Sequence, residues 1–143
     1  MRKIRTEIDI AAPPERVWAV LTDFAAYPRW NPFIKSIAGT PAVGERLTVS
    51  INLPGRSAMT FKPVVKAAQP ARELRWRGTV LMRGIFDGEH FFLVQPSGAD
   101  GTHFIHGEVF SGLLVGLFSR MFDDTEAAFR AMNDALKEQA ERA

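Results

Sequence analysis

Three residues in the second half of the chain could do chemistry together: His90, His106 and Glu108. Period-two alternation along two consecutive strands places all three on the face that also carries Phe92 and Phe104. A six-residue connection joins these strands, so His90 lies opposite either His106 or Glu108, with Cβ atoms about 5.5 Å apart. Imidazole and carboxylate groups at that separation can share a proton, orient a ligand or bind a divalent metal ion.

Three interpretations of this His-His-Glu cluster are open. In the first, Glu108 and a histidine satisfy each other in the core, because a buried carboxylate without a partner is costly. In the second, they form a polar anchor that orients a bound ligand. In the third, they act as an acid–base pair or hold a metal ion. No second shell for a metal ion is visible in the sequence, and we expect no metal ion or other cofactor. His103 falls on the opposite face and is expected at the surface.

The hydrophobic pattern predicts the elements that position this cluster. Ile4 to Ile10 alternate between apolar and charged residues and predict a half-buried first strand. A short helix follows from Pro14 to about Thr22, and then a compact aromatic segment from Asp23 to Phe33. Further strands are predicted by the alternations Leu47/Val49/Ile51, Phe61/Pro63/Val65 and Leu74/Trp76, and by a hairpin of Ile85 to Gln95 and Thr102 to Phe110. We expect about seven strands, antiparallel because their connections are short.

A long amphipathic helix is expected to end the chain. From Leu113 onward, polar residues such as Asn133 lie off an apolar stripe whose members are spaced three and four apart. The stripe consists of Leu114, Phe118, Met121, Thr125, Ala128, Phe129, Met132 and Leu136. Because a lone helix covers only one face of a sheet, the pattern predicts an α+β fold in which a curved antiparallel sheet wraps this helix. Room for an apolar molecule is expected between them.

The composition excludes several classes of function. The 143-residue chain has no cysteine, which excludes thiolate metal sites and cysteine nucleophiles. A net charge of +2 without a basic cluster gives no support for nucleic-acid binding. The start of the chain lacks the apolar core of a signal peptide, and we expect a cytoplasmic protein. No phosphate-binding loop, nucleotide fingerprint or Ser-His-Asp set is present.

Several short motifs carry a family resemblance that covers essentially the whole chain. They are Ala12 to Trp18, Asp23-Phe24, Tyr27 to Phe33, Leu74 to Gly78, Phe86 to His90 and His106 to Gly112. In these motifs the chain resembles the SRPBCC superfamily, the START-like and polyketide cyclase-like helix-grip proteins. The resemblance implies a single ligand-binding domain over residues 1–143, with two short helices after the first strand and a deep hydrophobic cavity. Members of the superfamily include lipid carriers, hormone receptors and aromatic cyclases.

The implied cavity would be lined by aromatic and aliphatic side chains, together with the polar cluster. We expect ligand contacts from Trp30, Phe33, Leu47, Val49, Phe61, Trp76, His90, Phe92, Phe104, His106, Glu108, Phe118, Met121 and Thr125. The leading prediction is that the protein binds or carries a small hydrophobic molecule of lipid, aromatic or polyketide type. One alternative is a polyketide cyclase or dehydratase that uses a cavity histidine and Glu108. Another is a membrane-associated or partner-binding accessory module.

Three further features carry expectations about shape and partners. Asp87-Gly88 is expected to form a β-bulge that bends the sheet. The apolar pair Leu81-Met82 predicts a lip at the cavity mouth. The last hairpin has a second apolar face, which predicts a homodimer through that face. The members of this outer face are Phe91, Leu93, Ile105 and Val109.

Overall fold

Two antiparallel sheets form a curved wall in the computed structural model, which describes residues 1–79, 87–113, 115–117 and 119–142. The larger sheet has the order β1-β8-β7-β6-β5 and the smaller one the order β2-β3-β4. The strands are β1 (Arg2–Ile10), β2 (Ile34–Ala38), β3 (Thr48–Ile51), β4 (Met59–Phe61), β5 (Val64–Gln69), β6 (Glu73–Thr79), β7 (Asp87–Ser97) and β8 (Gly101–Ser111). The described residues therefore contain eight strands, where the pattern predicted about seven.

The named alternations did not indicate β2, and a second difference arises at Pro63. The alternation Phe61/Pro63/Val65 predicted one strand, but proline has no N–H to donate to a ladder, and the chain divides there into β4 and β5. The two sheets stay joined at this point, because the Leu47 N–H donates to the Pro63 carbonyl and the Val65 N–H donates to the Glu45 carbonyl. The wall thus bends at Pro63, where the chain passes from β4 in the smaller sheet to β5 in the larger one.

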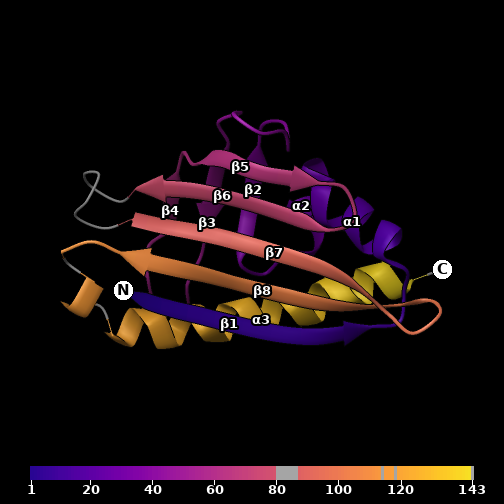
Figure 1. Ribbon diagram of the computed structural model, residues 1–143. Coiled ribbons are helices and arrows are strands. Elements are labelled where there is room, and N and C mark those ends of the chain that lie inside the picture. The colour runs from indigo at the N-terminus through magenta and orange to yellow at the C-terminus, as the bar shows by residue number, and fades with distance from the viewer. Residues whose placement is uncertain (80–86, 114, 118, 143) are drawn as a thin grey trace.

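The helices lie on the concave side and at one end of this wall. The chain forms α1 (Pro14–Thr22), the 3₁₀ helix η1 (Phe24–Ala26), α2 (Tyr27–Trp30), the 3₁₀ helix η2 (Val115–Leu117) and α3 (Ser119–Glu141). Figure 1 shows α3 running along the sheet beside β8 and β1, with α1 and α2 near the end where the chain terminates. The helix-grip architecture and the two short helices after the first strand are confirmed. The predicted stripe members Leu114 and Phe118 lie outside the described residues, as do Leu81-Met82.

The last hairpin fixes the register of the central cluster. In the pairing of β7 with β8, His90 lies opposite Glu108 and Phe92 lies opposite His106. This is the second of the two registers that the sequence allowed. The pairing runs without a register shift from Asp87 onward, so the bulge expected at Asp87-Gly88 is absent from these described strands.

On the outer face of the hairpin, Phe91 and Ile105 are buried and Leu93 and Val109 are half-buried. Phe91 is buried, and the cationic groups of Lys3 and Arg75 lie 5.7 and 4.9 Å from the centre of its ring. Gly107 permits this arrangement, because a Cβ there would lie 2.4 Å from Phe91 Cζ and 2.4 Å from the Ile4 carbonyl oxygen. Cationic stems thus shield an apolar ring from water. The homodimer through this face stays a prediction.

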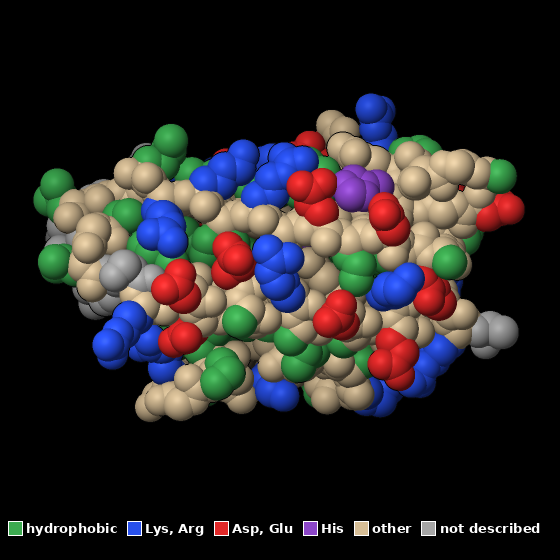
Figure 2. Space-filling model, turned by 90° about the horizontal axis from the view of Figure 1, so that it is seen from below, with side chains coloured by type: hydrophobic (Ala, Val, Ile, Leu, Met, Phe, Trp, Pro, Cys, Tyr) green, Lys and Arg blue, Asp and Glu red, His purple; other side chains and the backbone are tan. Residues whose placement is uncertain are grey.

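The edge formed by β1 and α3 is polar. Figure 2 looks onto this edge and shows basic and acidic side chains interspersed, without a patch of one sign. His103 lies on this outer surface, with Nδ1 2.7 Å from Asp9 Oδ1 and Nε2 2.6 Å from Glu7 Oε1. Hydrogen bonds to these two carboxylates raise the pKa of His103. Among the helices within the described ranges, none is long and apolar enough to cross a bilayer.

Candidate functional site

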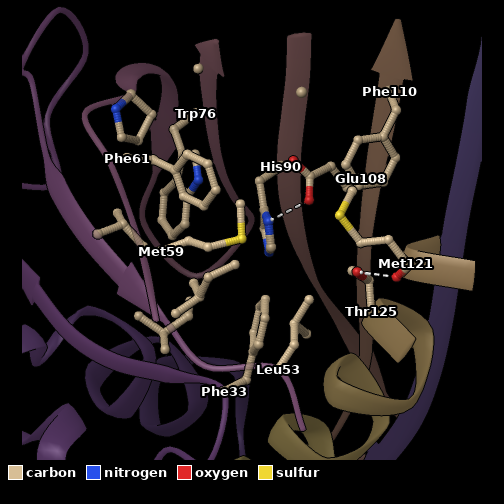
Figure 3. Close-up of a pocket in the computed structure, with 16 residues that line it drawn as sticks. Phe33, Leu53, Met59, Phe61, Trp76, His90, Glu108, Phe110, Met121 and Thr125 are labelled. Carbon is tan, nitrogen blue, oxygen red and sulfur yellow. Dashed lines mark hydrogen bonds and ion pairs between the residues drawn. The ribbon is translucent and has the colours of Figure 1, made fainter. Parts of the chain in front are cut away.

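A cavity of about 140 Å³ lies between the concave face of the wall and the first turns of α3. Figure 3 shows Phe61 and Trp76 on one side of it, Phe110 and Met121 on the other, and His90 between them. The described lining residues are Phe33, Ile34, Val49, Ile51, Leu53, Met59, Phe61, Pro63, Trp76, Gly78, Gly88, His90, Glu108, Phe110, Met121 and Thr125. Because most of these side chains are apolar, the cavity favours an apolar occupant.

Two local features shape this space. Gly78 and Gly88 lie opposite each other on β6 and β7, so the wall carries no side chain there. Asn31, just before β2, accepts hydrogen bonds at Oδ1 from the N–H groups of Phe33 (2.9 Å) and Ile34 (2.8 Å). This Asx-type turn fixes the direction in which the chain enters β2 and places both residues on the cavity wall.

A line of polar side chains runs from the cavity into the core. At its outer end, Glu108 Oε1 lies 3.3 Å from His90 Nδ1, an ion-pair distance (Figure 3). His90 Nε2 lies 2.7 Å from His106 Nε2, and His106 Nδ1 lies 2.9 Å from Asn133 Oδ1. Asn133 Nδ2 donates to Thr6 Oγ1, and the Thr6 hydroxyl donates to the His106 carbonyl, each at 2.8 Å. Four elements, β1, β7, β8 and α3, thus share one polar chain.

Aromatic rings enclose the inner part of this polar chain of side chains. The Phe129 ring stacks on the His106 imidazole at 4.0 Å with an interplanar angle of 10°, and Trp76 stacks on His90 at 5.1 Å. His106 has no exposed surface. Burial, followed by the proximity of His90, holds the pKa of His106 well below its usual value. His106 is therefore a neutral imidazole at physiological pH.

Most of the predicted site residues fall into two groups, one that lines the cavity and one that is buried beside it. Eight of them line the cavity: Phe33, Val49, Phe61, Trp76, His90, Glu108, Met121 and Thr125. Four others are buried without lining it: Leu47, Phe92, Phe104 and His106. Trp30 lies instead in a separate, polar surface hollow beside Arg16 and Arg29. Phe118 lies outside the described residues.

Strand alternation explains why those four residues were placed in the cavity. It identifies the face on which a side chain lies, but not how far along that face α3 covers the sheet. The rings of Phe92 and Phe104 pack with His106 beneath the middle of α3, where Phe129 fills the space. Leu47 points toward Gly39, because a Cβ at residue 39 would lie 2.8 Å from a Leu47 methyl group. These positions form the core and not the cavity wall.

Sequence reasoning missed two members of the polar chain. Asn133 was placed on the solvent face of the last helix, yet it is only 2% exposed. The available signal was its spacing of four from Phe129, which puts it on the buried stripe. Thr6 lies on the inner face of β1 as the alternation implies, but nothing marked it as a hydrogen-bonding residue. The missed lining residues are Ile34, Ile51, Leu53, Met59, Pro63, Gly78, Gly88 and Phe110.

The polar chain leaves little capacity for a metal ion. Both ring nitrogens of His90 and both of His106 already face a polar partner. Within the described ranges, no three or more His, Asp or Glu side chains form a group that could hold a metal ion. What the arrangement can do is exchange or direct a proton at the cavity wall, where Glu108 and His90 meet.

Comparisons with known proteins place the chain in a family. A model of the family described as polyketide cyclase / dehydrase and lipid transport matches residues 1–141. No curated protein sequence matches significantly. The fold resembles the Zhui aromatase/cyclase from a Streptomyces species, with 18% identity, a TM-score of 0.76, and 99% of this chain and 94% of that chain covered.

Two other solved structures have the same fold. A START superfamily protein from Mycobacterium smegmatis is 19% identical with a TM-score of 0.77, and 97% of each chain is covered. Norcoclaurine synthase from Thalictrum flavum, in complex with dopamine and hydroxybenzaldehyde, is 15% identical with a TM-score of 0.70, covering 99% of this chain and 88% of that one. The resemblance to the SRPBCC superfamily is confirmed. Because the family model spans nearly all of the sequence, this protein belongs to the polyketide cyclase / dehydrase and lipid transport family.

Proposed function

We propose that the protein binds a small, mainly apolar molecule in the cavity, with one polar end of that molecule against Glu108 and His90. The observation that carries this proposal is the cavity itself: an apolar hollow whose described lining residues include one carboxylate–imidazole pair, Glu108 and His90. Apolar walls supply affinity without direction, and a few polar groups set the orientation of the ligand. Proteins of this superfamily bind hydrophobic ligands, and some of them are cyclases, which agrees with this assignment.

The size of the cavity limits the ligand. A dry cavity of about 150 Å³ holds one benzene molecule. The described cavity, at about 140 Å³, matches a single aromatic ring or a short acyl chain. A long lipid or a multi-ring polyketide would extend beyond this space. We therefore favour a one-ring compound over the larger molecules that the family name suggests.

A second candidate function is catalysis of the cyclase or dehydratase type. It is favoured by the contact between Glu108 and His90 at the cavity wall, since an imidazole beside a carboxylate can take or give a proton. General acid–base catalysis requires the base within about 3 Å of the reacting atom or one water away. An enzyme would lose turnover and keep binding when Glu108 is replaced, whereas a carrier would change only in affinity or orientation. Membrane contact stays a prediction.

Filling the cavity should abolish binding. Met59 lies on the edge strand β4 and points toward His90 (Figure 3), so Met59→Trp places an indole in the hollow. We expect affinity for toluene, measured by NMR titration, to fall by at least about tenfold, the equivalent of 1.4 kcal/mol. Val43→Trp, at a 67% exposed position away from the cavity, is the matched control and should bind toluene like the wild type. Equal affinities in the two variants would contradict the proposed function.

A further inference from the structure

We infer that the cavity selects uncharged ligands carrying a hydroxyl group, of single-ring size, because a fixed chain of hydrogen bonds makes Glu108 an acceptor toward the ligand. The positioning residues are Thr6, Asn133 and His106, and none of them touches the cavity. This inference rests on the proposed function and adds the chemical class of the ligand. It follows from the hydrogen count along the polar chain, beginning at its inner end.

Thr6 sets the donor-to-acceptor direction of the hydrogen bonds along the polar chain. Its hydroxyl has one hydrogen, which it donates to the His106 carbonyl, so its oxygen must accept from the Asn133 amide. The amide nitrogen of Asn133 therefore faces Thr6, and its oxygen faces His106 Nδ1. His106 Nδ1 must then carry a hydrogen. Because His106 is neutral, its Nε2 has none and can only accept.

The contact between His106 and His90 extends this constraint on the hydrogen positions to the cavity wall. Since His106 Nε2 accepts, His90 Nε2 must be the donor across the 2.7 Å contact. His90 Nδ1 faces Glu108 Oε1 at 3.3 Å, and two lone pairs at that distance would repel. One proton therefore lies between Nδ1 and Oε1, on either partner. In both placements the pair has no net charge, and the hydrogens of His90 point away from the ligand.

The remaining oxygen of Glu108 is the group that a ligand meets. Oε2 lies over the backbone of Gly88, where a Cβ would come within 2.3 Å of it, so only glycine leaves this position open. No second partner of Glu108 is found among the described residues. Thr125 adds a second acceptor, because its hydroxyl hydrogen is donated to the Met121 carbonyl. A ligand hydroxyl can donate to Oε2, whereas a ligand carboxylate has no hydrogen to donate and would carry an unpaired charge into an apolar cavity.

Toluene and phenol form a matched pair of probes, since they have nearly the same size and only phenol donates a hydrogen bond. Binding to the full chain is measured by NMR titration for wild type, Glu108→Gln and Glu108→Leu. In Glu108→Gln the side-chain N–H donates a hydrogen bond to His90 Nδ1, so the amide oxygen still faces the cavity as an acceptor. In Glu108→Leu the acceptor is gone. The ratio of toluene Kd to phenol Kd should fall by roughly tenfold to a hundredfold in Glu108→Leu and by less in Glu108→Gln.

The outcomes distinguish the two proposals. If toluene fails to bind the wild type, the proposed function fails. If toluene binds and the ratio is the same in wild type and Glu108→Leu, the ligand class and the polar contact with Glu108 are wrong, while binding of a small apolar molecule in the cavity stands. Benzoate provides a third test. Because it has no hydrogen to donate to Oε2, it should bind more weakly than phenol to the wild type, and also to Glu108→Gln, whose amide oxygen still faces the cavity as an acceptor. Benzoate binding more tightly than phenol to the wild type would overturn the inference.

The positioning role has its own spectroscopic readout, which does not depend on any variant folding. Ring ¹⁵N NMR of the wild type should show His106 protonated at Nδ1 and not at Nε2, and His90 protonated at Nε2. Protonation of His106 at Nε2 would overturn the inference. Asn133→Leu should lower the phenol preference and leave toluene binding intact, whereas Met132→Leu, a buried neighbour outside the polar chain, should change neither.

Discussion

Replacing Phe129 with alanine is expected to lower the free energy of unfolding by about 3 to 5 kcal/mol, the usual cost of deleting a fully buried phenyl ring. Phe129 has no exposed surface, and its ring centre lies 4.0 Å from that of His106, 5.0 Å from that of His90 and 5.4 Å from that of Phe33. The substitution therefore removes the ring that separates the polar chain from the rest of the core. Water could then reach His106.

Urea denaturation followed by circular dichroism measures this effect. Arg130→Ala is the control on the same helix, because Arg130 is exposed and makes a surface ion pair with Glu126. Such pairs contribute about 0.3 to 0.5 kcal/mol. A loss below about 1 kcal/mol in Phe129→Ala would be smaller than any buried phenylalanine should give, and would show that α3 does not pack on the sheet as described.

The second large effect is expected at His106. His106→Leu leaves the His90 Nε2–H and the Asn133 amide oxygen without partners in the core, and each such loss costs about 1 to 3 kcal/mol. The effect should depend on pH. Burial lowers the pKa of His106 in the folded state. Below about pH 6.5, therefore, His106 is protonated in the unfolded protein but stays neutral in the folded protein.

The sign of this linkage follows directly. The contribution of His106 to stability is complete above about pH 6.5 and is lost as pH falls, with a slope of at most about 1.4 kcal/mol per pH unit. His103, whose raised pKa acts in the opposite direction, is the same in both proteins and cancels in their difference. Urea denaturation between pH 8 and pH 4 should show the wild-type advantage over His106→Leu shrinking as the pH falls. An advantage that stays constant with pH would contradict the neutral, buried state of His106.

The parts of the fold that obey simple periods could be predicted from the sequence. The alternation in β1, β7 and β8, and the spacing of three and four in α3, follow directly from which side chains must be buried. The strand β2 does not follow this rule. A register shift between Ile34 and Ser36 places Ile34 and Ile37, three residues apart, both in the core. A bulge of this kind depends on the partner strand, which local sequence does not reveal.

The candidate site was predictable only in part, for a related reason. Periodicity placed His90, His106 and Glu108 on one face, and the structure confirms that they are neighbours. It could not show that α3 covers His106 while the cavity begins at His90, because this depends on the lateral position of the helix. Asn133 was misplaced because its side chain is polar, although its position lies on the buried stripe. A polar residue in the core needs partners from other elements, and only the tertiary structure shows them.

The proposed function requires that the space between the curved wall and α3 is empty enough to hold a small apolar ligand. Crystals of the wild-type protein placed under xenon pressure test it directly, since xenon enters dry apolar cavities. We expect xenon to bind among Phe33, Val49, Met59 and Phe61, next to the His90 imidazole. Electron density that shows this space filled by the protein's own side chains, with no xenon between them, would contradict the account.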